Sequence, residues 1–221
     1  MPPKGPKRGH RDPERVRELV LDAGLTEFSR SGYAGTSLRD VSRASGISVG
    51  LIQYHFGTKQ ELYDAVKAYA IRQYGAAQEG PLSQSAGQPD SFRRLVDGGM
   101  RQFFKFTREN PDWLRLTLWS NLEGDTTAWP GEFDFVDMLV SRVRDAQEAG
   151  EIDPALDPEL LPIAVAGLMQ GWVEYRDRHA SRLAHLGGPD KQMERYLEHC
   201  LALLNGVRVG NAQTPTDDED S

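Results

Sequence analysis

The sequence predicts an all-α protein of about nine helices. Apolar residues recur at helical spacing in one segment after another. Breaks that contain Gly or Pro separate these segments, and several segments open on a residue that caps a helix. No segment alternates apolar and polar residues as a half-buried strand does, and no internal repeat is present in the sequence. Patterning, capping and the lack of strand signals thus agree on the fold class.

The first predicted helix begins at Asp12, an N-cap that precedes Pro13 at the first helical position. It continues to about Gly32 and carries one apolar face: Val16, Leu19, Val20, Ala23 and Phe28. Gly24 lies inside this helix, where a glycine costs up to about 1 kcal/mol relative to alanine.

Residues 37–56 predict a helix-turn-helix, a motif whose second helix lies in the major groove of DNA. Ser37 and Asp40 imitate a capping box at the start of one short helix. Gly46 supplies the turn, and Ser48 caps a second short helix. Most of the functional prediction depends on this segment.

The rest of the chain predicts further helices. Thr58 and Glu61 form a T-x-x-E capping box that begins the fourth helix. Residues 79–89 are rich in Gly, Pro, Ser and Gln and predict a loop. The remaining helices are expected over residues 91–108, from Asn110-Pro111 through Trp119, and over about 132–149, 158–180 and 190–206.

The charge is unevenly distributed along the 221 residues. The net charge is −7, yet residues 1–70 hold 11 Lys and Arg against 8 Asp and Glu, leaving 15 against 25 in residues 71–221. A basic head on an acidic body indicates that only the head meets phosphates. We expect residues 1–11 to be a disordered basic arm, which either reaches a minor groove or merely aids solubility. Residues 208–221 read as a disordered acidic tail.

Composition argues for a cytoplasmic protein without a membrane partner. No apolar run approaches the roughly 20 residues of a membrane span, and the basic N-terminal stretch lacks the apolar region of a secretory signal. The single cysteine, Cys200, excludes an intramolecular disulfide and a cysteine-based zinc cluster. Next to His199 it is either a redox-sensing thiol or, more commonly, a buried structural residue.

The stretch from Arg15 to Tyr69 resembles the TetR family of bacterial transcriptional regulators. The matching residues are FSRSGYAGTSLRDV from position 28, ASGISVG from position 44 and YHFGTKQEL from position 54. The resemblance implies a DNA-binding head over residues 12–57, followed by an effector-binding and dimerisation domain over residues 58–207. The resemblance further implies a homodimeric regulator that binds a palindromic operator. In the simplest case it is a repressor that a small effector releases from the DNA.

The resemblance and side-chain chemistry together predict the DNA contacts. Gly50 lets the helix approach base edges, Gln53 suits adenine, and Val49 suits a thymine methyl. The full predicted set is Thr36, Arg39, Ser48, Val49, Gly50, Gln53, Tyr54, His55 and Lys59. Thr36 and Arg39 would position the protein on the DNA backbone. Tyr54 and His55 have an alternative reading, in which they only pack at the end of the small unit.

Two further sets of residues follow from the family's layout. The last two long helices are expected to form a four-helix bundle with a partner's copies, through Leu161, Val165, Leu168, Tyr196, Leu197, Leu201 and Leu204. The competing reading is that these residues close a monomer core. A pocket for a largely apolar effector is expected among Phe103, Phe106, Trp113, Trp119, Trp129, Phe133, Met169 and Trp172, although an aromatic stripe at helical spacing is more often plain core.

Catalysis is not predicted. The sequence lacks the phosphate-binding, zinc-protease, nucleophile-elbow and dinucleotide-binding motifs, so we expect no enzyme activity, no cofactor and no metal. Two alternatives remain open beside the repressor: an activator or ligand-independent regulator of the same fold, and an all-α enzyme or binding module that does not use its DNA-binding head.

Overall fold

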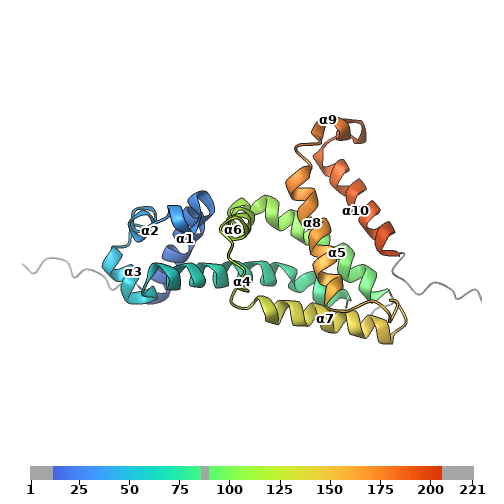
Figure 1. The fold of residues 1–221 in the computed structure, drawn as a ribbon, viewed down its shortest axis with the longest axis horizontal. Helices are drawn as coiled ribbons and strands as arrows, with labels where there is room; N and C mark the ends of the chain where they lie inside the picture. Colours follow the sequence, from blue (N-terminus) through green and yellow to red (C-terminus); the bar gives the residue numbers. More distant parts are fainter. Residues whose placement is uncertain (1–11, 86–89, 206–221) are drawn as a thin grey trace, which may run out of the picture. The chain divides into compact units, whose positions relative to one another are not determined.

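Ten α-helices and one 3-10 turn form the part of the chain described by the computed structural model, residues 12–85 and 90–205 (Figure 1). No strand occurs in these ranges, which confirms the all-α prediction. The helices are α1 (Pro13–Gly35), α2 (Leu38–Ser45), α3 (Val49–Phe56), α4 (Lys59–Ser85), α5 (Ser91–Glu109), α6 (Pro111–Leu122), α7 (Glu132–Glu148), α8 (Leu160–Tyr175), α9 (Ala180–Leu183) and α10 (Pro189–Asn205), with the 3-10 turn η1 (Ala184–Leu186) between the last two. Nine of these match the expected helices, and the short α9 is the addition. The predicted basic arm and acidic tail lie outside the described residues.

The chain divides into two compact units, each made of two stretches of sequence. The first unit takes the chain up to Gln73 together with Glu109–Glu132, and the second takes Tyr74–Arg108 together with the chain from Phe133 onward. The first unit therefore contains α6 as well as α1 to α3, and α4 begins in the first unit and ends in the second.

Local capping chemistry explains where the N-terminal helices begin. The Asp12 side chain accepts from the Glu14 N–H, and Ser37 and Asp40 make both bonds of a capping box at α2. At the start of α4, the Glu61 carboxylate accepts from the Thr58 N–H at 2.7 Å, while the Thr58 hydroxyl accepts from the Glu61 N–H at 3.2 Å. Each bond satisfies a backbone donor that a helix start leaves unpaired. These three sequence predictions are confirmed.

The prediction of a loop over residues 79–89 is wrong for its first part. α4 continues to Ser85 with Pro81 inside it, although proline lacks an N–H and disfavours a helix interior. Packing outweighs this cost, because Gln78 and Leu82 are buried and the Gln78 side chain donates to the Gly99 carbonyl at 3.2 Å. α5 makes room for the proline: a Cβ on Gly98 would lie 3.1 Å from the Pro81 Cβ.

Gly24 has a packing role that its helical position alone does not reveal. A Cβ at this position would lie 2.7 Å from a methyl group of Val66, which is fully buried on α4. Alanine would gain helix propensity, but the overlap with a rigid, β-branched side chain requires α1 and α4 to move apart. The glycine therefore sets the spacing of these two helices.

We expect Gly24→Ala to lower the free energy of unfolding by about 1–2 kcal/mol, since overpacking outweighs a propensity gain of about 1 kcal/mol. Gly75→Ala is the matched control, because a Cβ on that α4 glycine would meet nothing within 4 Å. Urea unfolding of both variants measures the difference. A Gly24→Ala protein as stable as Gly75→Ala would contradict the packing role.

Candidate DNA-binding surface

α2 and α3 are joined by a tight turn that glycine makes possible. Gly46 ends α2 in the left-handed conformation, with φ 66° and ψ 18°, and its N–H donates to the Ser42 carbonyl at 3.0 Å. Ile47 follows and is 1% exposed, so the turn is tied to the core of the first unit. Ser48 then caps α3, its hydroxyl accepting from the Leu51 N–H at 3.3 Å. The predicted helix-turn-helix is present.

The two faces of α3 differ sharply in exposure. Ile52 and Phe56 are buried and hold the helix against the unit. Gly50, Gln53 and Tyr54 lie on the opposite face and are exposed. Tyr54 is 82% exposed, so most of its side chain is accessible to a partner. This exposure argues against the reading in which Tyr54 merely packs within the head.

The other residues predicted to contact DNA differ in how far they are exposed. Arg39 and Ser48 are exposed, whereas Val49, His55 and Lys59 are partly buried. The Lys59 ammonium nitrogen lies 4.1 Å from the centre of the Tyr33 ring, a cation–π contact that orients it without neutralising its charge. The predicted set is therefore gathered at α3 and its flanks, with one exception.

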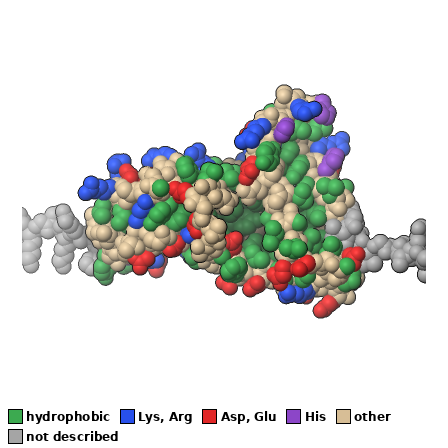
Figure 2. All heavy atoms as spheres, viewed as in Figure 1, with side chains coloured by type: hydrophobic (Ala, Val, Ile, Leu, Met, Phe, Trp, Pro, Cys, Tyr) green, Lys and Arg blue, Asp and Glu red, His purple; other side chains and the backbone are tan. Residues whose placement is uncertain are grey.

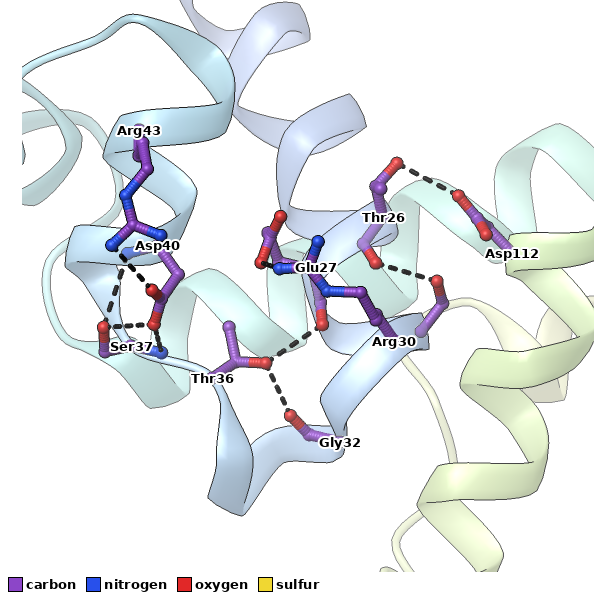
Figure 3. A network of polar contacts seen from close by, with 10 residues as sticks. Thr26, Glu27, Arg30, Gly32, Thr36, Ser37, Asp40, Arg43 and Asp112 are labelled. Carbon is purple, nitrogen blue, oxygen red and sulfur yellow. Dashed lines mark hydrogen bonds and ion pairs between the residues drawn. The ribbon is translucent and has the colours of Figure 1, made fainter.

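Thr36 is the exception, because it is 4% exposed (Figure 3). Its hydroxyl lies 3.0 Å from the Glu27 carbonyl oxygen and 2.8 Å from that of Gly32, where it donates. Its N–H donates to the Tyr33 carbonyl. The contact of Thr36 with a DNA phosphate, predicted from the sequence, is not supported by this position. The residue instead ties the end of α1 to the start of α2.

Arg17 is a residue of the site that sequence reasoning missed. From α1 its guanidinium donates to the His55 carbonyl at 3.0 Å, and its central carbon lies 4.6 Å from the centre of the Phe56 ring. A cation at the C-terminus of a helix stabilises it, so Arg17 holds the end of α3 in place. The two residues are 38 positions apart, and no sequence pattern signals their contact.

Charge around α2 and α3 favours a polyanionic partner. Several Lys and Arg side chains lie along the edge of the first unit that carries α1 and α2 (Figure 2). The acidic residues nearest the motif are engaged in caps: hydrogen bonds from Ser37 lower the pKa of the Asp40 carboxyl, and those from Thr58 lower the pKa of the Glu61 carboxyl. Both carboxylates thus stay charged and bound to backbone donors.

Comparison with known proteins agrees with this geometry. The family described as bacterial regulatory proteins, tetR family, matches residues 20–66, which span α1 to the first part of α4. A tetracyclin repressor-like C-terminal domain matches residues 98–197. The chain belongs to the TetR family. It is a DNA-binding transcriptional regulator, and the family is one of regulators rather than enzymes.

Individual relatives extend over most of this TetR-family chain. The HTH-type transcriptional repressor SCO4008 of Streptomyces coelicolor is 29% identical over 73% of this chain and 80% of its own length. The A-factor receptor protein of Streptomyces griseus is 25% identical over 80% of this chain and 60% of its own. A TetR family transcription regulator structure from Marinobacter aquaeolei VT8 has a TM-score of 0.67 and 18% identity, covering 86% of this chain and 95% of that one, and supports the fold alone.

Polar contacts fasten α6 to the head within the first unit. α1 kinks at Gly32, where φ is 71°, and the freed N–H groups of Tyr33 and Ala34 donate to the Glu123 carboxylate at 2.7 and 2.9 Å. About two turns before Glu123, the Arg115 guanidinium on α6 donates to the Ser29 carbonyl at 3.2 Å. The TetR-family head is thus braced by residues that lie 86 to 90 positions further along the sequence than the residues they contact.

The predicted effector residues do not form one group. Trp113, Trp119 and Trp129 belong to the first unit, and the indole N–H groups of Trp113 and Trp129 donate to Ala70 and Ser120. Phe133 is 68% exposed and lines no core. The remaining members lie in the second unit with further rings nearby: Phe103, Phe106, Met169 and Trp172, beside Tyr74, Phe104, Phe135 and Tyr196.

The predicted dimer residues are divided between core and surface. Leu161 is 7% exposed and Leu197 is 0% exposed, so these two lie in the core of the chain itself, in line with the competing reading. Val165, Leu168, Tyr196, Leu201 and Leu204 are half-buried. The large apolar residues of α8 and α10 that are exposed are Leu160, Ile163, Tyr175 and Leu203, of which sequence periodicity pointed only to Leu160.

Several smaller expectations can be placed. Cys200 is buried, and burial raises the pKa of its thiol, which favours the structural reading over redox sensing. Across residues 12–85 and 90–205, His, Cys, Asp and Glu nowhere gather in a group that could hold a metal ion. None of the described helices combines the length and hydropathy needed to cross a bilayer.

Proposed function

We propose that this TetR-family regulator is a homodimeric, cytoplasmic repressor that binds a palindromic operator and leaves it when a small, largely apolar effector binds the second unit. The observation that carries the proposal is the exposed face of α3, where Gly50, Gln53 and Tyr54 stand clear of the core. Among its relatives, one is named a repressor and another a receptor for A-factor, which supports repression and ligand response.

The exposed chemistry of α3 and its flanks suits duplex DNA. Gln53 can donate to and accept from an adenine edge in the major groove. Arg39, Tyr54 and Lys59 offer donors for phosphate oxygens on either side, and Arg17 holds the helix that presents them. The N-terminus of α3 adds partial positive charge near a phosphate. We therefore retain the predicted contacts except Thr36.

A gel shift on the DNA upstream of the protein's own gene tests this reading. Lys59→Ala should weaken binding to all duplexes alike and reduce its salt dependence, because a phosphate contact is lost. Gln53→Ala should relax the preference at one base pair and cost about 1–3 kcal/mol on the preferred site. Lys105→Ala, at an exposed α5 position, is the control. The DNA-binding proposal fails if the wild-type protein shifts no duplex at low salt.

An exposed apolar stripe on α8 supports the dimer. Leu160, Ile163, Gly167 and Tyr175 recur at spacings of three, four and eight residues, and hydrophobic side chains gather over α8 in Figure 2. Leu160 is 62% exposed and Ile163 is 65% exposed. A two-fold partner would cover the same stripe on both copies, and its symmetry would match two operator half-sites.

We expect Ile163→Asp to yield a monomer, because the dimer would bury an unpaired carboxylate on each side of its axis. Sedimentation should show half the mass of the wild-type particle, and operator affinity should fall with it. Leu122→Asp is the control, since Leu122 is 78% exposed but lies on α6. A wild-type protein that sediments as a monomer, or an Ile163→Asp dimer, would contradict this interface.

A further inference from the structure

Trp172 differs from the other buried tryptophans in the bonding of its indole N–H. It is 7% exposed, yet its Nε1 atom has no hydrogen-bond acceptor among the described residues. Trp113 and Trp129 are equally buried, and their N–H groups donate to the Ala70 carbonyl at 3.1 Å and the Ser120 hydroxyl at 3.3 Å. Because a buried donor without a partner costs about 1–3 kcal/mol, the position of Trp172 calls for an acceptor from beyond the described residues.

The surroundings of Trp172 are aromatic. Its ring stacks on Tyr196, with the ring centres 4.6 Å apart and the planes at 20°. From Tyr196 the contacts continue through Phe104 and Phe103 to Tyr74, so that rings from α4, α5, α8 and α10 form one connected cluster. The Tyr196 hydroxyl donates to the Leu168 carbonyl, and its oxygen accepts no hydrogen bond from the Trp172 indole.

This aromatic cluster is not sealed from solvent. Tyr74, Phe135 and Tyr196 are only half-buried, and so is Met169 on the α8 turn that precedes Trp172. Partly exposed rings around an unsatisfied donor are typical of an apolar binding site with few polar groups that fix a ligand's orientation. A flexible Met beside the rings can adapt to the shape of a ligand.

The interior of the second unit carries no charge that would suit an ionic ligand. Its buried polar residues, within the described ranges, are Gln78, Ser85 and Thr107, whereas the buried charged residues Glu27 and Lys67 belong to the first unit. Desolvation raises the pKa of the Tyr74 and Tyr196 hydroxyls, which therefore stay neutral at physiological pH. An anion or cation placed here would lose its hydration without gaining a counter-charge.

We propose that Trp172 is the hydrogen-bond donor of the effector site, and that the effector is a neutral apolar molecule whose carbonyl or ether oxygen accepts from the Trp172 Nε1–H. The inference rests on the proposed function, in that it takes the second unit as the effector domain. It adds the chemical class of the effector and the residue that selects it: the apolar part of the effector packs against the aromatic rings, and its oxygen supplies the missing acceptor.

Matched small molecules can test this on the full-length protein. With ¹⁵N-labelled tryptophan, the four indole N–H signals are recorded with 2-acetylnaphthalene, 2-ethylnaphthalene and 2-naphthoate, which share a ring system and differ in one oxygen or one charge. The ketone should move the Trp172 signal downfield and bind about five- to tenfold more tightly than the hydrocarbon, as one hydrogen bond of about 1 kcal/mol implies. The naphthoate should bind least.

Trp172→Phe assigns the signal and supplies the second readout. It should abolish the preference for the ketone while leaving the affinity for 2-ethylnaphthalene nearly unchanged. If this variant does not fold, Trp113→Phe, Trp119→Phe and Trp129→Phe assign Trp172 by elimination, and the wild-type signal alone decides. The proposal is overturned if ketone and hydrocarbon bind equally, if the preference survives in Trp172→Phe, if the naphthoate binds best, or if no probe binds.

Gel shifts on the same samples separate this inference from the proposed function. Operator binding without any probe tests the DNA-binding part alone. If the ketone binds at Trp172 but the protein stays on the operator, the inference stands, and the proposal that an effector releases the protein from DNA fails. If the operator is bound and no probe moves the Trp172 signal, the inference fails and the DNA-binding regulator stands.

Discussion

Lys67→Met is expected to lower the free energy of unfolding by about 2 kcal/mol, because it breaks a buried ion pair and leaves the partner carboxylate uncompensated. Lys67 lies on α4 and is 3% exposed. Its ammonium nitrogen lies 2.9 Å from an Asp125 oxygen and 3.0 Å from an Asp64 oxygen. We expect less than the roughly 3–5 kcal/mol usual for a broken buried pair, since the Asp125 side chain remains 20% exposed and water can reach it.

Lys67→Met should disturb more than one ion pair, because Asp125 also belongs to a chain of hydrogen bonds. The Ser120 hydroxyl donates to Asp125 at 3.2 Å and accepts from the Trp129 indole at 3.3 Å. The Lys67 ammonium also lies 4.8 Å from the centre of the Tyr63 ring. The Lys67 charge thus holds the segment after α6, which contains Asp125, in contact with α4 within the first unit.

Urea unfolding measures the effect, with Lys105→Met as the control because Lys105 is exposed on α5. The double variant Lys67→Met/Asp125→Asn should be less destabilised than the two single changes summed, since it removes both charges together. Strict additivity would show that the pair does not interact. A Lys67→Met protein as stable as Lys105→Met would contradict the burial argument itself.

The same pair gives an acid-sensitive contribution to stability. Burial alone would raise the pKa of Asp125, but the Lys67 ammonium and the Thr127 N–H outweigh it and lower the pKa below the ordinary 3.8. A carboxyl whose pKa is lower in the folded state stabilises the fold fully above its unfolded pKa, and the contribution is lost as the pH falls through the folded value. Unfolding midpoints of wild type and Asp125→Asn should therefore converge below about pH 4.

Local chemistry made the first part of the fold predictable. Ser37 with Asp40, and Thr58 with Glu61, satisfy backbone donors three residues away, so their spacing is visible in any sequence window. Gly46 likewise follows from the conformation its turn requires. The buried side of α3 could be predicted because its apolar residues Ile52 and Phe56 recur at the spacing of one helical turn.

Long-range packing decided what the sequence did not reveal. Pro81 is typical of a helix end, yet α4 continues through it because Gln78 and Leu82 are buried and because Gly98 on α5 leaves room for the proline ring. Leu161 and Ile163 are both apolar α8 residues, yet one closes the core and the other faces outward. Hydrophobicity alone does not distinguish a buried from an exposed apolar residue, because a helix with apolar residues on both its buried and its exposed side is apolar all round.

Gly50→Ala is expected to weaken operator binding about 10- to 100-fold, the equivalent of one lost base contact of about 1–3 kcal/mol, while leaving the protein at least as stable. Gly50 is exposed in the first turn of α3, and a Cβ there would meet nothing of the protein within 4 Å. Alanine also favours the helix by up to about 1 kcal/mol. Any loss of operator affinity must then come from the contact between α3 and the DNA.

Gly75→Ala separates this effect from helix propensity. It adds the same methyl group to a helical glycine with the same open surroundings, but on α4 away from the helix-turn-helix. Both variants should unfold at equal or higher urea concentrations than wild type, and only Gly50→Ala should lose operator affinity. If Gly50→Ala binds as tightly as Gly75→Ala, then α3 does not approach the bases at its first turn. Base reading would in that case have to begin at Gln53, one turn further along the same exposed face, and the affinity lost on Gln53→Ala would have to account for all of the specificity of the helix.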